Sequence, residues 1–341
     1  MRLVSRSFTA SAVRLDAFKE LPEKRDGPRL LLPSQITAYE RFAPVLSSLP
    51  PVDFGIAYGS GVMEQAERSG PAPLIDFIVS APDLQAFHAE NLKRNPDHYP
   101  LFARALGPKF IAWANDAWGA GLWYVTMVKV QGLEIKYGVV ASDTLVRDLQ
   151  QWRTLYTAGR LQKPVLVLTE TPEISAALSA NLRYALSYAL LLLPERFSEF
   201  ELWEKITSIS YSGDPRMNIP GGENPRKIQN IVRGKNVLEG FRSLYSNHVG
   251  RVGLRFADNQ SPAASQVAKF LWQGNGDATL QQPGNSEHLA QLLVDLPRPL
   301  KVKVAGHFKT DVDDPTAWLE ISRKSGFRKV VEDGELLCLG R

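Results

Sequence analysis

The sequence predicts an α+β protein with a sheet in its first half and helices in its second. Three observations support this fold class. Apolar residues alternate with polar or small ones at 52–58, which is the two-residue period of a strand. Residues 122–130 and 133–140 are two β-type runs separated by Gln131-Gly132, the pattern of a hairpin. From Thr171 onward, helix starts and long apolar helical faces dominate.

The other elements of the first half follow in order. A helix is expected at 35–46, and a loop rich in Gly and Pro at 64–73 leads to a second strand at 74–79. Pro82 opens a helix that ends at Asn95-Pro96. Ser142 is expected to cap a helix whose apolar face extends to Leu155, and a short strand follows at 165–168.

Three helix starts define the second half. Thr171-Pro172-Glu173 combines a hydroxyl cap with proline at the first helical position and predicts a helix that ends at Leu193. Ser198 and Glu201 have the spacing of a capping box. A third helix is expected from about Pro225. Three helices joined by a loop predict a compact second domain of winged-helix type.

Composition supports this division and limits the class of protein. A chain of 341 residues with 44% hydrophobic residues can fill two cores, here assigned to residues 30–170 and 171–258, with a C-terminal region at 259–341. The net charge of +4 favours an anionic partner without choosing among phospholipid, nucleotide and RNA. The single cysteine, Cys338, excludes a disulfide framework and a cysteine-based zinc site.

Residues 1–20 have the composition of a mitochondrial presequence. Arg2, Arg6 and Arg14 are interleaved with hydroxyl residues, and the first acid is Asp16. A disordered basic terminus is the alternative. The most apolar run, 185–193, is shorter than the ~20 residues that a membrane-spanning helix needs. Membrane contact is therefore expected to be peripheral.

The feature with the most chemical content is a glycine turn followed by an acid in an apolar strand. Tyr58-Gly59-Ser60-Gly61 ends the first strand, and Asp76 lies inside the second. Glycine N–H groups can surround a phosphate, and a carboxylate among apolar residues needs a partner such as a metal ion. Together they indicate a nucleoside triphosphate with Mg²⁺, as in the nucleotidyltransferase fold of the DNA polymerase β type. The alternative is an ordinary turn and an acid that faces solvent.

Two further groups could complete a nucleotide site. Lys136 stands where a strand would carry an apolar residue, and its ammonium could meet a phosphate; a lysine that protects an edge strand is the alternative. The end of the helix after Pro82 gathers polar groups that could hold a base or ribose, and these are Asn91, Asn95, His98 and Tyr99.

Two segments could contact lipid. Arg216 and Lys227 flank a glycine-bearing turn before a helix N-terminus, which suits a phosphate monoester such as a lipid head group; a plain surface loop is the alternative. Residues 318–331 mix apolar residues with four cations. This pattern fits a basic amphipathic segment on an anionic membrane, or a terminal element packed on the body of the protein.

Six strings in this order resemble the mitochondrial CDP-diacylglycerol synthase family, also called the mitochondrial translocator assembly and maintenance protein. They run from about Val52 to Tyr245, a span that takes in most of the folded chain. The strings are Tyr58-Gly59-Ser60-Gly61-Val62, Ile75-Asp76-Phe77, residues 91–99, Lys136-Tyr137-Gly138-Val139, residues 155–164 and residues 211–230.

The resemblance implies a phosphatidate cytidylyltransferase that joins CTP to phosphatidic acid with Mg²⁺, on the matrix face of the mitochondrial inner membrane, in the route to cardiolipin. It implies that Asp76 binds the metal, that Lys136 contacts phosphate and that Tyr58, Gly59, Ser60 and Gly61 line the triphosphate. By their charge and polarity, Arg216, Lys227 and Asn230 are the candidates for the phosphatidate side. The expected partners are CTP, phosphatidic acid and an anionic membrane surface, and no nucleic acid.

One departure and two rival functions stay open. Polymerase β-like enzymes carry a second acid two residues after the first, but this position is Ile78. Asp53, Asp116, Glu134 and Asp143 are the candidates for the second ligand. A nucleotidyltransferase acting on RNA should show a stronger basic stripe with stacking aromatics. A non-enzymatic inner-membrane assembly factor would keep only a remnant of the fold.

Overall fold

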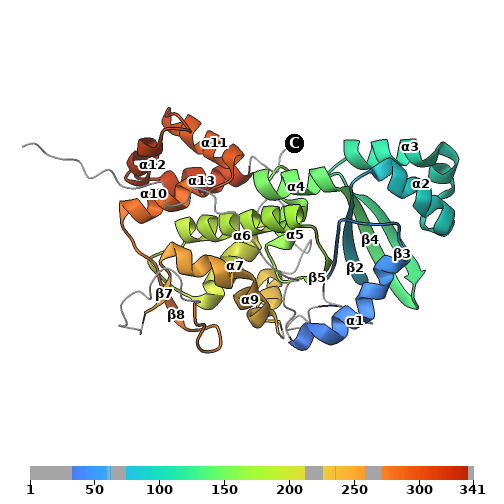
Figure 1. Cartoon of the computed structure of the whole chain (residues 1–341). Coiled ribbons are helices and arrows are strands. Elements are labelled where there is room, and N and C mark those ends of the chain that lie inside the picture. The colour runs from blue at the N-terminus through green and yellow to red at the C-terminus, as the bar shows by residue number, and fades with distance from the viewer. Residues whose placement is uncertain are drawn as a thin grey trace, which may run out of the picture.

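A computed structural model describes residues 33–59, 62, 74–211, 226–234, 236–257 and 270–336. It shows a sheet-containing lobe, formed by the first part of the chain, beside a mostly helical lobe (Figure 1). The predicted α+β class is confirmed. The predicted presequence at 1–20 lies outside the described residues.

The first lobe is built on a mixed five-stranded sheet with the order β3-β4-β2-β1-β5. Its strands are β1 (Phe54–Tyr58), β2 (Ile75–Ala81), β3 (Trp123–Val130), β4 (Leu133–Ala141) and β5 (Leu166–Thr169). Strands β2 and β4 are parallel, and the other neighbours are antiparallel. The β3–β4 hairpin turns at Gln131 and Gly132, which both have positive φ, as a two-residue hairpin loop requires. The expected strands are therefore present, each shifted by at most two residues at either end.

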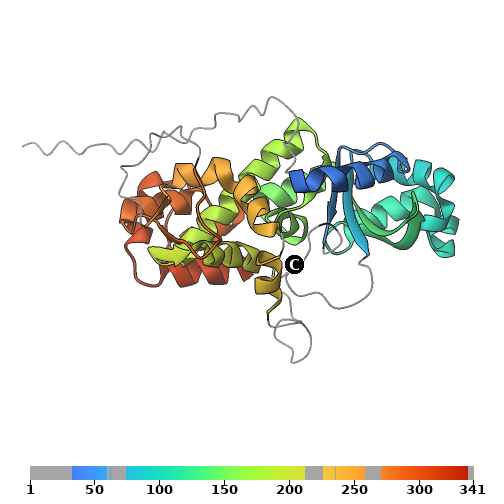
Figure 2. The ribbon, with the colours of Figure 1, turned by 90° about the horizontal axis from the view of Figure 1, so that it is seen from below.

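The two faces of this sheet pack against different helices. Ile56, Tyr58 and Ile78 belong to a core shared with the helical lobe. Their neighbours Ala57 and Phe77 point the other way, into a second core, because successive strand residues alternate between faces. The first face is covered by α4 (Ser142–Gln151), α5 (Tyr156–Leu161) and α6 (Pro172–Leu192), and the second by α1 (Pro33–Ser47), α2 (Leu84–Arg94) and α3 (Leu101–Ala117) (Figures 1 and 2).

Two details of this lobe differ from expectation. Ser142 begins α4 but does not cap it, because its hydroxyl donates to Asp53 Oδ2 at 2.7 Å and Ala141 occupies the cap position. Helix α3 was not expected from the sequence, because Gly107-Pro108 interrupts its pattern. Gly107 has φ 79° and ψ 177°, so α3 consists of two short helices joined at a kink.

The helical lobe contains the expected caps. Thr171 accepts from the Ile174 N–H at the start of α6, and Ser198 and Glu201 form the capping box. The helix expected from Pro225 is two helices, because Asn236 is left-handed, with φ 62°. The elements of this part are α7 (Glu199–Ile209), α8 (Lys227–Val232), α9 (Val237–Val249) and a small sheet of β6 (Arg196–Ser198), β8 (Thr279–Gln281) and β7 (Arg255–Phe256).

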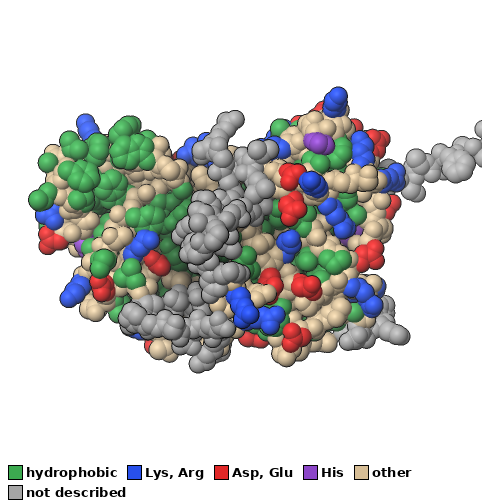
Figure 3. Space-filling view, turned by 180° about the vertical axis from the view of Figure 1, so that it is seen from behind, with side chains coloured by type: hydrophobic (Ala, Val, Ile, Leu, Met, Phe, Trp, Pro, Cys, Tyr) green, Lys and Arg blue, Asp and Glu red, His purple; other side chains and the backbone are tan. Residues whose placement is uncertain are grey.

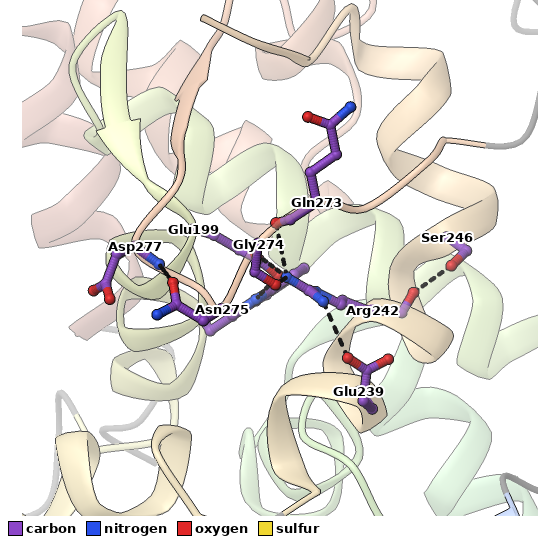
Figure 4. Close-up of polar contacts among 9 residues, drawn as sticks. Glu199, Glu239, Arg242, Ser246, Gln273, Gly274, Asn275 and Asp277 are labelled. Carbon is purple, nitrogen blue, oxygen red and sulfur yellow. Dashed lines mark hydrogen bonds and ion pairs between the residues drawn. The ribbon is translucent and has the colours of Figure 1, made fainter. Parts of the chain in front are cut away.

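A buried ion pair ties these elements together. Arg242 of α9 donates two hydrogen bonds of 2.8 Å to the carboxylate of Glu199, the first residue of α7. The same guanidinium donates to the carbonyls of Gln273 and Gly274, in the segment before β8, and to Glu239 (Figure 4). Because each charge is hydrogen-bonded, burial of this pair does not leave an unsatisfied ion.

The C-terminal segment packs on the body of the protein. It forms α10 (Ser286–Val294), α11 (Arg298–Phe308), α12 (Pro315–Ser322) and α13 (Phe327–Leu336). The apolar residues proposed for a membrane-facing side are buried in the core, among them Trp318, Ile321, Phe327 and Val331. Of the two expectations for this segment, the structure shows the terminal element that packs on the body. None of the described helices has the length and apolar character needed to cross a bilayer.

Candidate active site

Three side chains meet in a row across the first face of the sheet. Tyr58 of β1 lies opposite Asp76 of β2, and Asp76 lies opposite Lys136 of β4. Residues opposite one another on neighbouring strands point to the same face. Lys136 Nζ is 4.0 Å from Asp76 Oδ1. The structure therefore brings the predicted metal ligand and the predicted phosphate contact together.

The glycine turn lies directly beside the acid. Gly59 follows β1 with φ 89°, a conformation that favours glycine. A Cβ atom at Gly59 would lie 3.2 Å from Asp76 Oδ2, so the carboxyl group points towards the turn. The Val62 N–H donates to the Gly59 carbonyl at 3.1 Å and closes the turn. Ser60 and Gly61 lie outside the described residues.

The Asp76 carboxyl group is partly withdrawn from water. Its side chain is 28% exposed and that of Lys136 is 32% exposed. Burial raises the pKa of Asp76, and the cations of Lys136 and Arg160 oppose this rise. A further positive charge at this position, such as a metal ion, would stabilise the ionised carboxylate more strongly.

Three of the four acids considered as a second metal ligand lie away from this row. Asp53 accepts from Ser142, and Asp116 accepts from the Thr144 hydroxyl at 3.2 Å. Asp143 is in the first turn of α4, which follows the opposite end of β4.

The donors that remain fit a magnesium ion held mainly by its substrate. Glu134 precedes Lys136 by two residues on β4 and so shares its face. Within the described ranges, no cluster of three or more His, Cys, Asp or Glu could hold a metal ion. Mg²⁺ commonly takes one or two protein carboxylates and completes its octahedron with substrate phosphates and water. Asp76, directed at the turn that starts at Gly59, would be one such carboxylate.

Aromatic rings and an arginine surround the row, and the sequence prediction did not include them. The ring of Tyr124 on β3 lies 4.5 Å from Lys136 Nζ, and its hydroxyl bonds that of Tyr156 at 2.7 Å. Arg160 of α5 lies over the ring of Tyr58, with its Cζ 4.6 Å from the ring centroid. Burial raises the pKa of Tyr58 to about 12, which keeps this phenol neutral beside the cation.

Two sequence signals pointed to these neighbours. Arg160 belongs to the string 155–164, which supported the family resemblance but received no role. Gly138, two residues after Lys136, makes room for the tyrosine, because a Cβ there would lie 2.8 Å from Tyr124 Cε1. A glycine in the middle of a strand often marks such a close approach.

A second cationic cluster continues from α5 towards the helical lobe. Lys163 is buried and donates to the Gly159 carbonyl at 2.6 Å and to Ser210 Oγ at 2.5 Å. Burial lowers the pKa of Lys163, and Arg160 lowers it further. Lys163 and Lys227 lie 5.5 and 5.7 Å from the ring centroid of Tyr211.

One residue predicted to contact a lipid phosphate, Lys227, belongs to this cluster. Tyr211 and Lys227 stand at either end of the segment 212–225, so both ends converge near α5. Arg216 lies outside the described residues, and Asn230 is half-buried on α8. Lys227 therefore lies on the same side of the molecule as α5.

The residues predicted to hold a base or ribose lie on the other face of the sheet. Asn91 is fully buried and donates to the hydroxyls of Tyr99 and Tyr137 at 3.0 and 2.9 Å. Asn95 donates to Asn91 Oδ1, and His98 Nδ1 bonds the Tyr137 hydroxyl at 2.8 Å. Tyr137 is next to Lys136 on β4 and so points the opposite way. The geometry gives Asn91 and Tyr99 a structural role, and nucleotide binding by these four residues stays a prediction.

Comparison with known proteins identifies the family. Residues 42–335 match the family described as "Phosphatidate cytidylyltransferase, mitochondrial". Proteins with that name are 39% identical over 260 residues in Schizosaccharomyces pombe, 39% over 272 in Drosophila melanogaster and 40% over 216 in Homo sapiens. These alignments cover 75%, 74% and 62% of this chain, and 64%, 77% and 47% of the respective relatives. The chain thus spans just under two thirds of the S. pombe protein and about half of the human one. Because the matched region takes in nearly every described element, the chain belongs to the mitochondrial phosphatidate cytidylyltransferase family.

Proposed function

We propose that this protein is a phosphatidate cytidylyltransferase. A phosphate oxygen of phosphatidic acid attacks the α-phosphorus of CTP, and the bond from that phosphorus to the oxygen bridging to the β-phosphate breaks. The products are CDP-diacylglycerol and pyrophosphate, which carries the electron pair of the broken bond. The observation that carries the proposal is the row of Asp76 and Lys136 beside the Gly59 turn.

The first face of the sheet supplies the groups that such a transfer needs. The N–H groups of the turn that starts at Gly59 bind the triphosphate, as expected of a glycine nest. Lys136 and Arg160 neutralise negative charge on the phosphates in a partly dehydrated setting, where a cation acts more strongly than in water. Asp76 would hold Mg²⁺, which, when bound, supplies Lewis-acid neutralisation of the phosphate oxygens.

The second cluster would receive the lipid phosphate. Lys227 and Asn230 on α8, with Arg216 in the segment before it, are proposed for this side. Lys163 has a positioning role beside these residues. Its hydrogen bonds hold Gly159 and Ser210 together, and a Cβ at Gly159 would lie only 2.5 Å from that of Ser210. This contact fixes α5, and hence Arg160, against the end of α7.

The finer fold and the cellular setting belong to the same proposal. The sheet lobe, about residues 30–170, is of the polymerase β nucleotidyltransferase type, and residues 171–258 are of the winged-helix type. The presequence-like start, residues 1–20, supports import into mitochondria, where the protein would act peripherally on the matrix side of the inner membrane. CDP-diacylglycerol made there would serve cardiolipin synthesis.

Incorporation of radiolabelled CTP into lipid tests the function. Purified protein is incubated with labelled CTP and phosphatidic acid, with Mg²⁺ or with EDTA. We expect labelled CDP-diacylglycerol and an equal amount of pyrophosphate with Mg²⁺, and neither with EDTA. Label transferred to an RNA acceptor instead would favour the RNA nucleotidyltransferase. Absence of turnover with every acceptor would favour the non-enzymatic assembly factor.

A further inference from the structure

Helix α3 and the residue after it carry an unusual concentration of exposed hydrophobic side chains. Of the ten large hydrophobic residues that are exposed in the described part of the chain, five lie here. They are Leu101 (79% exposed), Phe102 (58%), Leu106 (57%), Trp113 (57%) and Trp118 (58%), and we call them the α3 surface. Hydrophobic side chains gather on this lobe in the space-filling view (Figure 3). Soluble monomers rarely expose such patches without a binding role.

The two tryptophans of the α3 surface are held in place by packing. Trp113 and Trp118 contact each other with ring centroids 5.4 Å apart, and each contacts Phe110, at 5.9 and 6.4 Å. Phe110 in turn packs on the small core of Tyr99, Ala103 and Ile111. Rings in fixed positions lose little conformational entropy on binding, which favours their use as anchors.

The charge of this segment suits an anionic surface. Between Asp97 and Asp116 the chain contains two cations, Arg104 and Lys109, and no acid. Arg104 is paired with Asp97 at 3.0 Å, so Lys109 carries the charge argument. Lys109 is exposed on the second half of α3. Tryptophan is enriched at the membrane–water interface, and an exposed lysine beside it is attracted to anionic lipid.

The α3 surface adjoins the candidate active site through strand β3. Trp123 stacks on Tyr99 at 6.5 Å and packs on the same small core as Phe110. The next residue, Tyr124, points to the other face and covers Lys136. One edge strand therefore borders both the exposed apolar surface and the proposed catalytic groups. In the C-terminal segment, by contrast, Trp318, Ile321, Phe327 and Val331 are buried.

We propose that the α3 surface docks the protein on a bilayer that contains anionic phospholipid. The Trp, Phe and Leu side chains enter the interfacial region, and Lys109 contacts the lipid phosphates. Docking through α3 places β3 and the site behind it next to the membrane that holds the substrate. The choice of lipid over a protein partner rests on the proposed function.

Vesicle flotation tests the proposal. Wild type, the double variant Trp113→Ser/Trp118→Ser and the control Leu271→Ser are mixed with vesicles of phosphatidylcholine, with and without phosphatidic acid. Leu271 is 77% exposed but lies outside the α3 surface, so its replacement removes a similar exposed group. Insertion of two exposed tryptophans into the bilayer would bury enough apolar area that their loss should weaken binding at least about tenfold. We expect wild type and Leu271→Ser to float equally well, and better when phosphatidic acid is present.

A second variant and a second measurement keep the outcomes distinct. Phe102→Ser/Leu106→Ser changes the other half of α3 and should weaken binding in the same way, with thermal melting as the check of folding. Unchanged flotation of both double variants would overturn the proposal. The proposal would also be overturned if the double variants bound vesicles normally but, unlike wild type, no longer self-associated in size-exclusion chromatography. The α3 surface would then join two copies of the protein.

Turnover on a short-chain, water-soluble phosphatidate separates docking from catalysis. Flotation is measured without CTP and does not depend on the enzymatic activity. A variant that loses flotation and turnover on vesicles, but keeps turnover on the soluble lipid, supports docking through α3. Wild type that floats but turns over neither form would reject the proposed function and leave the docking result standing.

Discussion

Polar residues on the two faces of the five-stranded sheet have different roles. On the face under α2, Asn91, Tyr99, Tyr137 and His98 satisfy one another in a buried network. On the face under α5, Lys136 meets a ring at 4.5 Å and its carboxylate partner Asp76 at 4.0 Å, which is too long for a hydrogen bond. A closed network stabilises the fold, whereas loosely paired charges are available to a charged ligand. We call the face under α2 the closed face and the face under α5 the open face. Lys136 and Tyr137 are adjacent on β4 and point to the open and the closed face, respectively.

The largest expected effect comes from the open face. Asp76→Asn removes the proposed metal ligand and should reduce CTP turnover by about 10³-fold, the scale of losing one preorganised electrostatic group. Burial raises the pKa of Asp76, so its ionised form is destabilising at neutral pH, and the neutral amide should leave the melting temperature unchanged or higher. Labelled CTP incorporation and thermal melting check the two expectations. Turnover at the wild-type rate would remove Asp76 from the site.

The next effect concerns the closed face. Asn91→Ala leaves the buried hydroxyls of Tyr99 and Tyr137 without this donor and should lower the free energy of unfolding by about 2–4 kcal/mol. The exposed Asn275→Ala is a matched control, expected within about 0.5 kcal/mol of wild type. Urea unfolding measures both variants, and their KM for CTP should stay near that of wild type. A higher KM for CTP with unchanged stability would instead support nucleotide binding by Asn91.

A further effect on the same face of the sheet appears only at acidic pH. His88 bonds Tyr99 and Asn115, and burial lowers its pKa to about 4 from the ordinary 6.5. The unfolded chain then binds the additional proton between pH 6.5 and about 4, so stability falls as the pH falls through this window. The full contribution is about 3 kcal/mol.

The contribution of His88 can be measured from the slope of the unfolding free energy against pH. His88→Gln should make the dependence shallower by up to one proton between pH 6.5 and 4, measured by urea unfolding at several pH values. The other groups with shifted pKa values, among them His98, His288 and Asp295, are unchanged by the substitution and set the slope that remains. An unchanged slope would show that the pKa of His88 is not lowered in the folded protein.

The sequence predicted the five strands of the first sheet well because alternation and turn residues are local signals, whereas the short strands β6, β7 and β8 were not predicted. It also selected Asp76 and Lys136, each a charge in an apolar strand. Their contact depends on the parallel pairing of β2 with β4, which are separated in the chain by α2 and α3, and no local pattern specifies that register. For the same reason, the polar residues around Asn91 were assigned to the same nucleotide site as Asp76. In the structure, Asn91 and His98 bond the hydroxyl of Tyr137, which lies on the opposite face of the sheet.

Other differences have equally physical causes. An amphipathic pattern such as that at 318–331 is the same for a helix on a membrane and for a helix on the body of the protein, so only the packing of Trp318 and Val331 decides between them. Arg160 and Tyr124 were missed because each reaches the site from an element, α5 or β3, that carries no acid or glycine turn of its own. Their roles appear only in three dimensions.

The smallest expected effect tests whether Tyr124 belongs to the open face by its ring or by its hydroxyl. The ring lies over Lys136 Nζ, while the hydroxyl bonds that of Tyr156. Tyr124→Phe keeps the ring and should change kcat/KM for CTP by no more than about twofold, because a cation attracted to a ring face needs no hydroxyl. Tyr124→Leu removes the ring and should reduce kcat/KM by about two- to tenfold, the range for a partly exposed cation–π contact. Steady-state kinetics on the two variants, with melting curves to confirm folding, make the comparison. If Phe costs as much as Leu, the hydroxyl pair with Tyr156 positions Lys136, and the open face depends on a hydrogen bond after all.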